Sequence, residues 1–187
     1  MMTEGQMNKA DARKSAFAVR KAAFAAGQGQ AAELLADFLS AHRGKALAGY
    51  MAMRTEIDPL AAMAAHQGPV CVPVIVANGQ ALKFREWSPG CAMQMGAFGA
   101  EIPADGAWVE PEVLIVPMMA FDARGFRLGY GGGFYDRTLQ GLRAKRPTLA
   151  VGFAFAAQEV AQVPVDDYDQ RLDVMLTEAG LRQFGGA

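Results

Sequence analysis

The chain has 187 residues, 52% of them hydrophobic and 20% charged, and a formal net charge of −1. This composition excludes a disordered chain and gives no overall field that would attract nucleic acid. Its apolar runs fall far short of the ~18 residues of a membrane span. The N-terminus lacks a secretion signal, and the two cysteines are too few for a disulfide framework. We therefore expect one cytoplasmic domain over residues 1–187, with neither nucleic-acid nor membrane partners.

The first half of the chain alternates helical and strand-like patterns. In chain order we predict helices over 9–26 and 31–42, a strand over 46–51, a third helix with Asp58 as N-cap and Pro59 in its first turn, a strand over 70–76, and a hairpin partner over 82–85. The first helix carries Lys9, Arg13 and Arg20 close to one common face.

The second half begins with a loop-like segment, 88–111, that is rich in glycine and proline. After it we predict a buried strand over 113–119, a glycine-rich loop, a helix over 135–142, and strands over 148–153 and 172–177. Helices that alternate with apolar strands indicate an α/β layered fold with a largely parallel central sheet flanked by helices.

The glycine-rich loop is the most informative segment. Five glycines lie between Arg124 and Asp136. A strand, a glycine loop and a helix in succession present backbone N–H groups to a phosphate, while Arg127 adds donors and Asp136 could hold a hard cation. A wide turn whose glycines serve only backbone geometry remains the alternative, since the loop is neither a Walker loop nor a good dinucleotide fingerprint.

Residues 116–137 resemble the signature of the 5-formyltetrahydrofolate cyclo-ligases, or 5,10-methenyltetrahydrofolate synthetases. That family carries the pattern Pro-x-x-Ala-Phe-Asp-x-x-Gly-x-Arg-Leu-Gly-x-Gly-x-Gly-Tyr-Tyr-Asp, which this chain matches almost completely, with Phe134 at the first aromatic position. The resemblance implies the NagB/RpiA/CoA-transferase-like architecture. It also implies ATP-dependent cyclisation of 5-formyltetrahydrofolate to 5,10-methenyltetrahydrofolate, by phosphoryl transfer to the formyl oxygen and attack by N10, with ADP and phosphate released.

The resemblance implies that the glycine loop binds ATP. The loop residues concerned are Arg127, Leu128, Gly129, Tyr130, Gly131, Gly132, Gly133, Phe134 and Tyr135. Lys9 and Arg13 match a Lys-x-x-x-Arg pattern whose side chains reach the ATP phosphates, although a solvated basic helix face is the alternative. Some family members have lysine where this chain has Gly132, so we expect Arg127 and the N-terminal helix to supply the positive charge. Arg20 is a weaker candidate.

The family uses an aspartate at the positions of Asp136 and Asp169 as Mg²⁺ ligands, and Arg127 and Asp136 are the expected catalytic residues. Asp136 could instead cap its own helix. Four aspartates share the segment around Asp169, and the residues alone do not choose among them: Asp166, Asp167, Asp169 and Asp173.

The resemblance places the folate against Met51, Glu56, Phe134 and Tyr135. A carboxylate at position 56 can accept the two donors of the amidine-like edge of the pterin. Thr55 stands where the family has glycine. The competing interpretations are a nucleotide- or folate-binding relative without turnover, and an isomerase or transferase with similar layering.

Overall fold

The computed structural model describes residues 8–185. Its helices are α1 (Lys9–Ala26), α2 (Ala31–Ser40), α3 (Leu60–Ala65) and α4 (Phe134–Lys145). Its strands are β1 (Leu47–Ala48), β2 (Val70–Val74), β3 (Lys83–Glu86), β4 (Met93–Met95), β5 (Glu101–Pro103), β6 (Val113–Val116), β7 (Ala120–Phe121), β8 (Arg127–Leu128), β9 (Leu149–Phe153), β10 (Val174–Thr177) and β11 (Gly180–Gln183). Two 3₁₀ turns complete the chain, η1 (Ala97–Gly99) and η2 (Ala156–Gln158).

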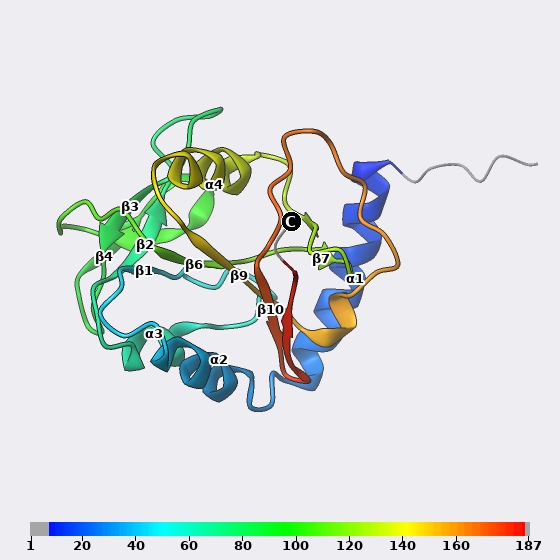
Figure 1. Cartoon of the computed structure of the whole chain (residues 1–187), viewed down its shortest axis with the longest axis horizontal. Coiled ribbons are helices and arrows are strands. Elements are labelled where there is room, and N and C mark those ends of the chain that lie inside the picture. Colours follow the sequence, from blue (N-terminus) through cyan, green and yellow to red (C-terminus); the bar gives the residue numbers. More distant parts are fainter. Residues whose placement is uncertain (1–7, 186–187) are drawn as a thin grey trace, which may run out of the picture.

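A seven-stranded sheet with the order β11-β10-β9-β6-β1-β2-β3 forms the centre of the molecule (Figure 1). The five inner strands are parallel, and β3 and β11 pair antiparallel at the two edges. The sheet grows in both directions from β1, with β2 on one side and β6 on the other. Ligands of open parallel sheets bind beyond the carboxyl ends of the strands at such a reversal. The topology therefore points to the ends of β1 and β6.

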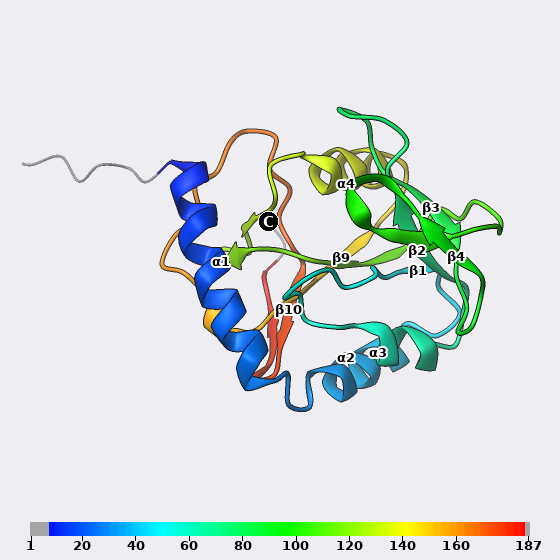
Figure 2. The same cartoon turned by 180° about the vertical axis from the view of Figure 1, so that it is seen from behind.

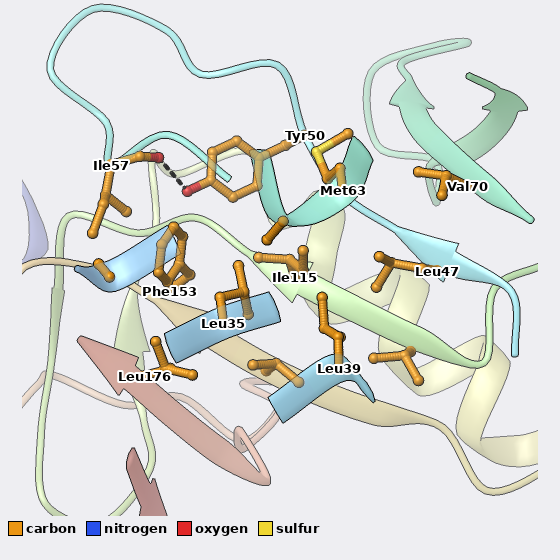
Figure 3. Packing of buried hydrophobic residues seen from close by; sticks show 14 of the residues in the cluster. Leu35, Leu39, Leu47, Tyr50, Ile57, Met63, Val70, Ile115, Phe153 and Leu176 are labelled. Atoms are coloured by element: carbon orange, nitrogen blue, oxygen red, sulfur yellow. Dashed lines mark hydrogen bonds between the residues drawn. The ribbon is translucent and has the colours of Figure 1, made fainter. Parts of the chain in front are cut away.

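Helices cover both faces of the sheet, so its strands are apolar on both sides. The face toward α2 and α3 buries Leu35 and Leu39 against Leu47 and Ile115 (Figure 3). The opposite face buries Leu139 and other α4 side chains against a second set of strand residues. Alternate residues of one strand point to opposite faces, which is why neighbouring residues of β6 belong to different clusters.

Helix α1 stands apart from these layers, beyond the end of the sheet and beside β7 (Figure 2). Its small residues Ala12 and Ala16 pack on Met119, Leu128 and Val163. This small apolar cluster holds the basic face of α1 close to the ends of the central strands. Within residues 8–185, no helix has both the length and the apolar character needed to cross a membrane.

The structure confirms the predicted α/β layering, the bounds of α1 and the β2–β3 hairpin. Helix α3 begins at Leu60, later than predicted, with Pro59 and not Asp58 at the N-cap, although Asp58 Oδ1 accepts from the N–H of Leu60 at 2.9 Å. The strand predicted over 113–119 ends at Val116, since Pro117 has no N–H for the ladder. The segment 88–111 is not all loop, because β4 and β5 form a small hairpin. Such short strands lack the apolar period that identifies longer ones.

Candidate active site

The candidate site lies where the topology places it, beyond the carboxyl ends of β1 and β6. Three segments meet there: α1, the turn around Glu56 that follows β1, and the glycine loop between β8 and α4. The acidic segment around Asp169 borders it, because Lys9 of α1 contacts that segment. Residues far apart in the sequence thus share one site.

Arg13 holds the glycine loop from the side of α1. Its Nε donates to the carbonyl of Gly129 at 2.9 Å. Its guanidinium lies close to Gly131, where an added Cβ would be 3.2 Å from Cζ. Gly131 also has a φ of 102°, a conformation that side-chain-bearing residues rarely adopt. From α4, Arg137 donates to the carbonyl of Gly132. The structure therefore brings the predicted basic helix and the predicted loop together.

We predict that Gly131→Ala raises the KM for ATP about tenfold or more, since both the left-handed backbone and the Arg13 contact must change. Gly141→Ala is the matched control, because Gly141 lies within α4 and a Cβ there meets nothing within 4 Å. The control should keep its ATP kinetics and gain some stability from the better helix former. Equal nucleotide kinetics in the two variants would contradict the prediction.

Arg127 lies beneath the loop and pairs with protein groups. Its Nη2 donates to Asp136 Oδ1 at 2.8 Å and its Nη1 to the carbonyl of Gln170 at 2.8 Å. The backbone N–H of Gln170 donates to the same Asp136 oxygen at 2.9 Å. Arg127 thereby ties the start of α4 to the acidic segment. Asp136 sits in the first turn of α4 and the N-cap is Gly133, so Asp136 is not the cap. Its role with phosphate or metal stays a prediction.

Lys9 bridges two of the four candidate aspartates. Its Nζ lies 2.6 Å from Asp166 Oδ2 and 3.1 Å from Asp169 Oδ2. Burial alone would lower the pKa of Lys9, but the hydrogen bonds to the two carboxylates outweigh it and raise the pKa above its ordinary value. Asp173 does not contact Lys9. Its Oδ2 instead accepts hydrogen bonds from Arg143 Nη2 at 2.8 Å and from the N–H of Ala150 at 2.7 Å.

The donor set suits Mg²⁺ bound together with a phosphate chain. Among residues 8–185 no cluster of three or more His, Cys, Asp or Glu side chains forms a metal cage. Mg²⁺ in nucleotide sites needs only one or two carboxylates, with waters and phosphate oxygens as the other ligands. Arg127 and the N–H of Gln170 both donate to Asp136 Oδ1, and Gln170 is the neighbour of Asp169. Asp136 is therefore hydrogen-bonded to the segment that carries Asp169.

Glu56 belongs to a buried polar network on the other side of the loop. Its Oε2 accepts from the N–H of Met53 at 2.9 Å, and its Oε1 accepts from the hydroxyl of Tyr130. Arg20 donates to the same hydroxyl and lies 3.9 Å from Glu56 Oε1. Burial and the charge of Glu56 raise the pKa of Tyr130, so its hydroxyl stays protonated and donates to the carboxylate.

The sequence did not reveal that the Arg20 side chain is buried. It is only 1% exposed and also donates to Thr55 Oγ1 at 3.1 Å and to the carbonyl of Met118 at 3.4 Å. Its spacing from Arg13 places it on the same helix face, which suggests a phosphate ligand. The structure instead turns it inward to the carboxylate predicted for folate.

The predicted aromatic contacts lie beside this network. Tyr135 has a buried hydroxyl without a hydrogen-bond partner among the described residues, and burial raises its pKa. A Cβ on Gly132 would lie 2.6 Å from the ring of Phe134, so a side chain at position 132 requires this ring to move. Met51 is half-buried against the cluster that contains Tyr50, whose hydroxyl donates to the Ile57 carbonyl at 2.7 Å (Figure 3). The folate contacts of Met51, Phe134 and Tyr135 stay predictions.

The chain is similar in sequence to known 5-formyltetrahydrofolate cyclo-ligases. An Escherichia coli K12 5-formyltetrahydrofolate cyclo-ligase is 48% identical over 66 residues, which cover 35% of this chain and 36% of that protein. The Haemophilus influenzae enzyme of the same name is 38% identical over 93 residues, covering 47% of this chain and 49% of that protein. These matched stretches span less than half of either relative.

Two solved structures are similar to this chain over nearly its whole length. A 5,10-methenyltetrahydrofolate synthetase from Aquifex aeolicus superposes with a TM-score of 0.75 at 27% identity, covering 97% of this chain and 95% of that chain. One from Mycoplasma pneumoniae gives a TM-score of 0.73 at 20% identity, which shows the fold alone. The model of the 5-formyltetrahydrofolate cyclo-ligase family matches residues 5–178. With almost its full length matched, the chain belongs to the 5-formyltetrahydrofolate cyclo-ligase family.

Proposed function

We propose that this chain catalyses the ATP- and Mg²⁺-dependent cyclisation of 5-formyltetrahydrofolate to 5,10-methenyltetrahydrofolate. The main support for the proposal is that two different groups contact the glycine loop. Arg13 of the basic helix contacts one end of the loop, and the buried carboxylate of Glu56 contacts the Tyr130 hydroxyl within it. One loop therefore adjoins groups suited to a polyphosphate and a carboxylate suited to a pterin.

The phosphate half of the site supplies position and positive charge. Arg13 is already docked on the loop and Lys9 sits one helical turn away, so both can face one polyphosphate. Backbone N–H groups of the glycine segment can add donors. Phosphoryl transfer requires alignment and charge neutralisation more than a protein nucleophile. Asp136 and Asp169 would hold Mg²⁺, which supplies further neutralisation of the phosphate charge when bound.

In the proposed reaction the formyl oxygen attacks the γ-phosphorus of ATP and ADP leaves with the bridging oxygen. N10 then attacks the activated formyl carbon and loses its proton, and phosphate departs with the former formyl oxygen. Glu56 would orient the pterin by accepting its two donors. The chain's contribution is to hold the two substrates in line, so that the formyl oxygen is close to phosphorus.

We also propose that the protein acts in the cytoplasm. Cys71 and Cys91 are both free thiols, as a reducing compartment permits. Burial raises the pKa of Cys71 to about 12, which leaves its thiol protonated and unreactive at neutral pH. Both substrates are small molecules, and no nucleic acid or membrane is part of the proposal.

The proposal is tested by mixing the protein with 5-formyltetrahydrofolate, ATP and Mg²⁺ and following the near-ultraviolet absorbance of the methenyl product. We expect product only when ATP and the metal are both present, and loss of turnover when a chelator is added. Folded protein that binds ATP and folate without forming product would contradict the enzymatic proposal. It would favour a binding protein instead.

A further inference from the structure

Tyr130 joins the two halves of the site. Its backbone lies in the glycine loop between Gly129 and Gly131, whereas its hydroxyl reaches the network around Glu56. There it donates to Glu56 Oε1 and accepts from Arg20 Nη1. The signature pattern leaves this position open, so the tyrosine is a feature of this chain and not one that the pattern requires.

Glu56 is closed off in this conformation. The residue is 7% exposed, and each of its carboxylate oxygens already accepts one hydrogen bond. The cavity beside it, lined by Arg20, Tyr50 and Met118 among others, is too small to hold a water molecule. A ligand that pairs with both oxygens of Glu56 must therefore move a group that lies there now.

Tyr130 is the group most easily moved. The residue is 54% exposed, and its neighbour Gly131 has the backbone freedom of a glycine at positive φ. The other partner of Glu56, the N–H of Met53, belongs to the same turn and cannot leave without unfolding it. Arg20 is fully buried and would remain 3.9 Å from the carboxylate, so Glu56 keeps its counter-charge when Tyr130 departs.

We propose that the Tyr130 hydroxyl occupies the Glu56 oxygen that the pterin takes over, so that folate binding releases the glycine loop for ATP. This inference rests on the proposed function. Because the same residue belongs to both half-sites, the two binding equilibria are coupled, and each substrate must change the affinity of the other by the same factor. Folate should therefore tighten ATP binding in the wild-type protein.

Tyr130→Phe tests the inference because it removes the hydroxyl and keeps the ring. The variant should bind 5-formyltetrahydrofolate about ten- to a hundredfold more tightly, since a hydrogen bond to a charged group no longer competes with the ligand. A merely structural role for Tyr130 predicts the opposite sign, because a damaged site binds more weakly. Tyr168→Phe is the matched control, since it removes a phenol hydroxyl from a residue that is 78% exposed.

The measurement is calorimetric titration of 5-formyltetrahydrofolate without ATP, followed by titration of a non-hydrolysable ATP analogue with and without saturating folate. We expect the factor by which folate tightens analogue binding to fall toward one in Tyr130→Phe and to persist in Tyr168→Phe. Folate affinity that is unchanged or weaker in Tyr130→Phe would overturn this inference and leave the proposed function standing. Absence of folate binding to the wild-type protein would overturn both.

Discussion

Asp122→Asn is expected to lower the free energy of unfolding by about 3 kcal/mol, because it leaves buried hydrogen-bond donors without an acceptor. Asp122 has no solvent exposure and accepts five hydrogen bonds. Two come from the Arg124 side chain, and the others come from the backbone N–H groups of Arg124, Phe126 and Val163. An amide cannot accept all of them, so buried donors lose their partner.

Urea denaturation measures this effect as a lower midpoint with an unchanged slope. The matched control is Asp37→Asn on the exposed surface of α2, which should change stability by no more than about 0.5 kcal/mol. Equal midpoints for the two variants would show that Asp122 does not stabilise the segment between β7 and Val163.

Asp122 also makes the free energy of unfolding depend on pH. Burial would raise the pKa of Asp122, but the hydrogen bonds from Arg124 and the backbone outweigh it and hold the pKa below its usual value. A carboxyl whose folded pKa is depressed stabilises the fold above its unfolded pKa of about 3.9 and loses that contribution as the pH falls through the folded value. The stability difference between wild type and Asp122→Asn should therefore shrink below about pH 4.

The sequence predicts best those features that depend on residues close together in the chain. Glycines of the loop that need positive φ lie within a few residues of each other, whereas the contact of Arg13 with Gly129 joins residues 116 apart and depends on the fold. The long strands are recognisable in the sequence because they are continuously apolar. Strands of two residues, such as β7 and β8, are invisible to such patterns because their pairing depends on the surrounding fold.

The network around Glu56 shows what the sequence could not provide. Arg20 and Tyr130 are 110 residues apart, and Tyr130 and Glu56 are 74 apart. Helical spacing correctly put Arg20 on the face of Arg13 but could not tell that one arginine turns into the protein. Arg127 raises the same difficulty, since a loop arginine suggests a phosphate ligand while the structure pairs it with Asp136.

Glu56→Gln is expected to raise the KM for 5-formyltetrahydrofolate about 30- to 100-fold and to change the KM for ATP by no more than about threefold. The pterin edge presents two donors, and hydrogen bonds to a charged acceptor contribute about 1.5–3 kcal/mol each. An amide offers one acceptor and a competing donor in their place. Steady-state kinetics with each substrate varied in turn separates the two constants, and Glu33→Gln on α2 is the matched control.

Neutralising Glu56 also removes the counter-charge of Arg20, whose guanidinium is 1% exposed. Some loss of stability therefore accompanies the loss of folate affinity, and unfolding curves must show that the variant is folded at the assay temperature. In a folded variant, a selective rise in the folate KM assigns Glu56 to the pterin. A parallel rise in both constants would instead mean that Glu56 supports the structure of the site, with no direct contact to the substrate.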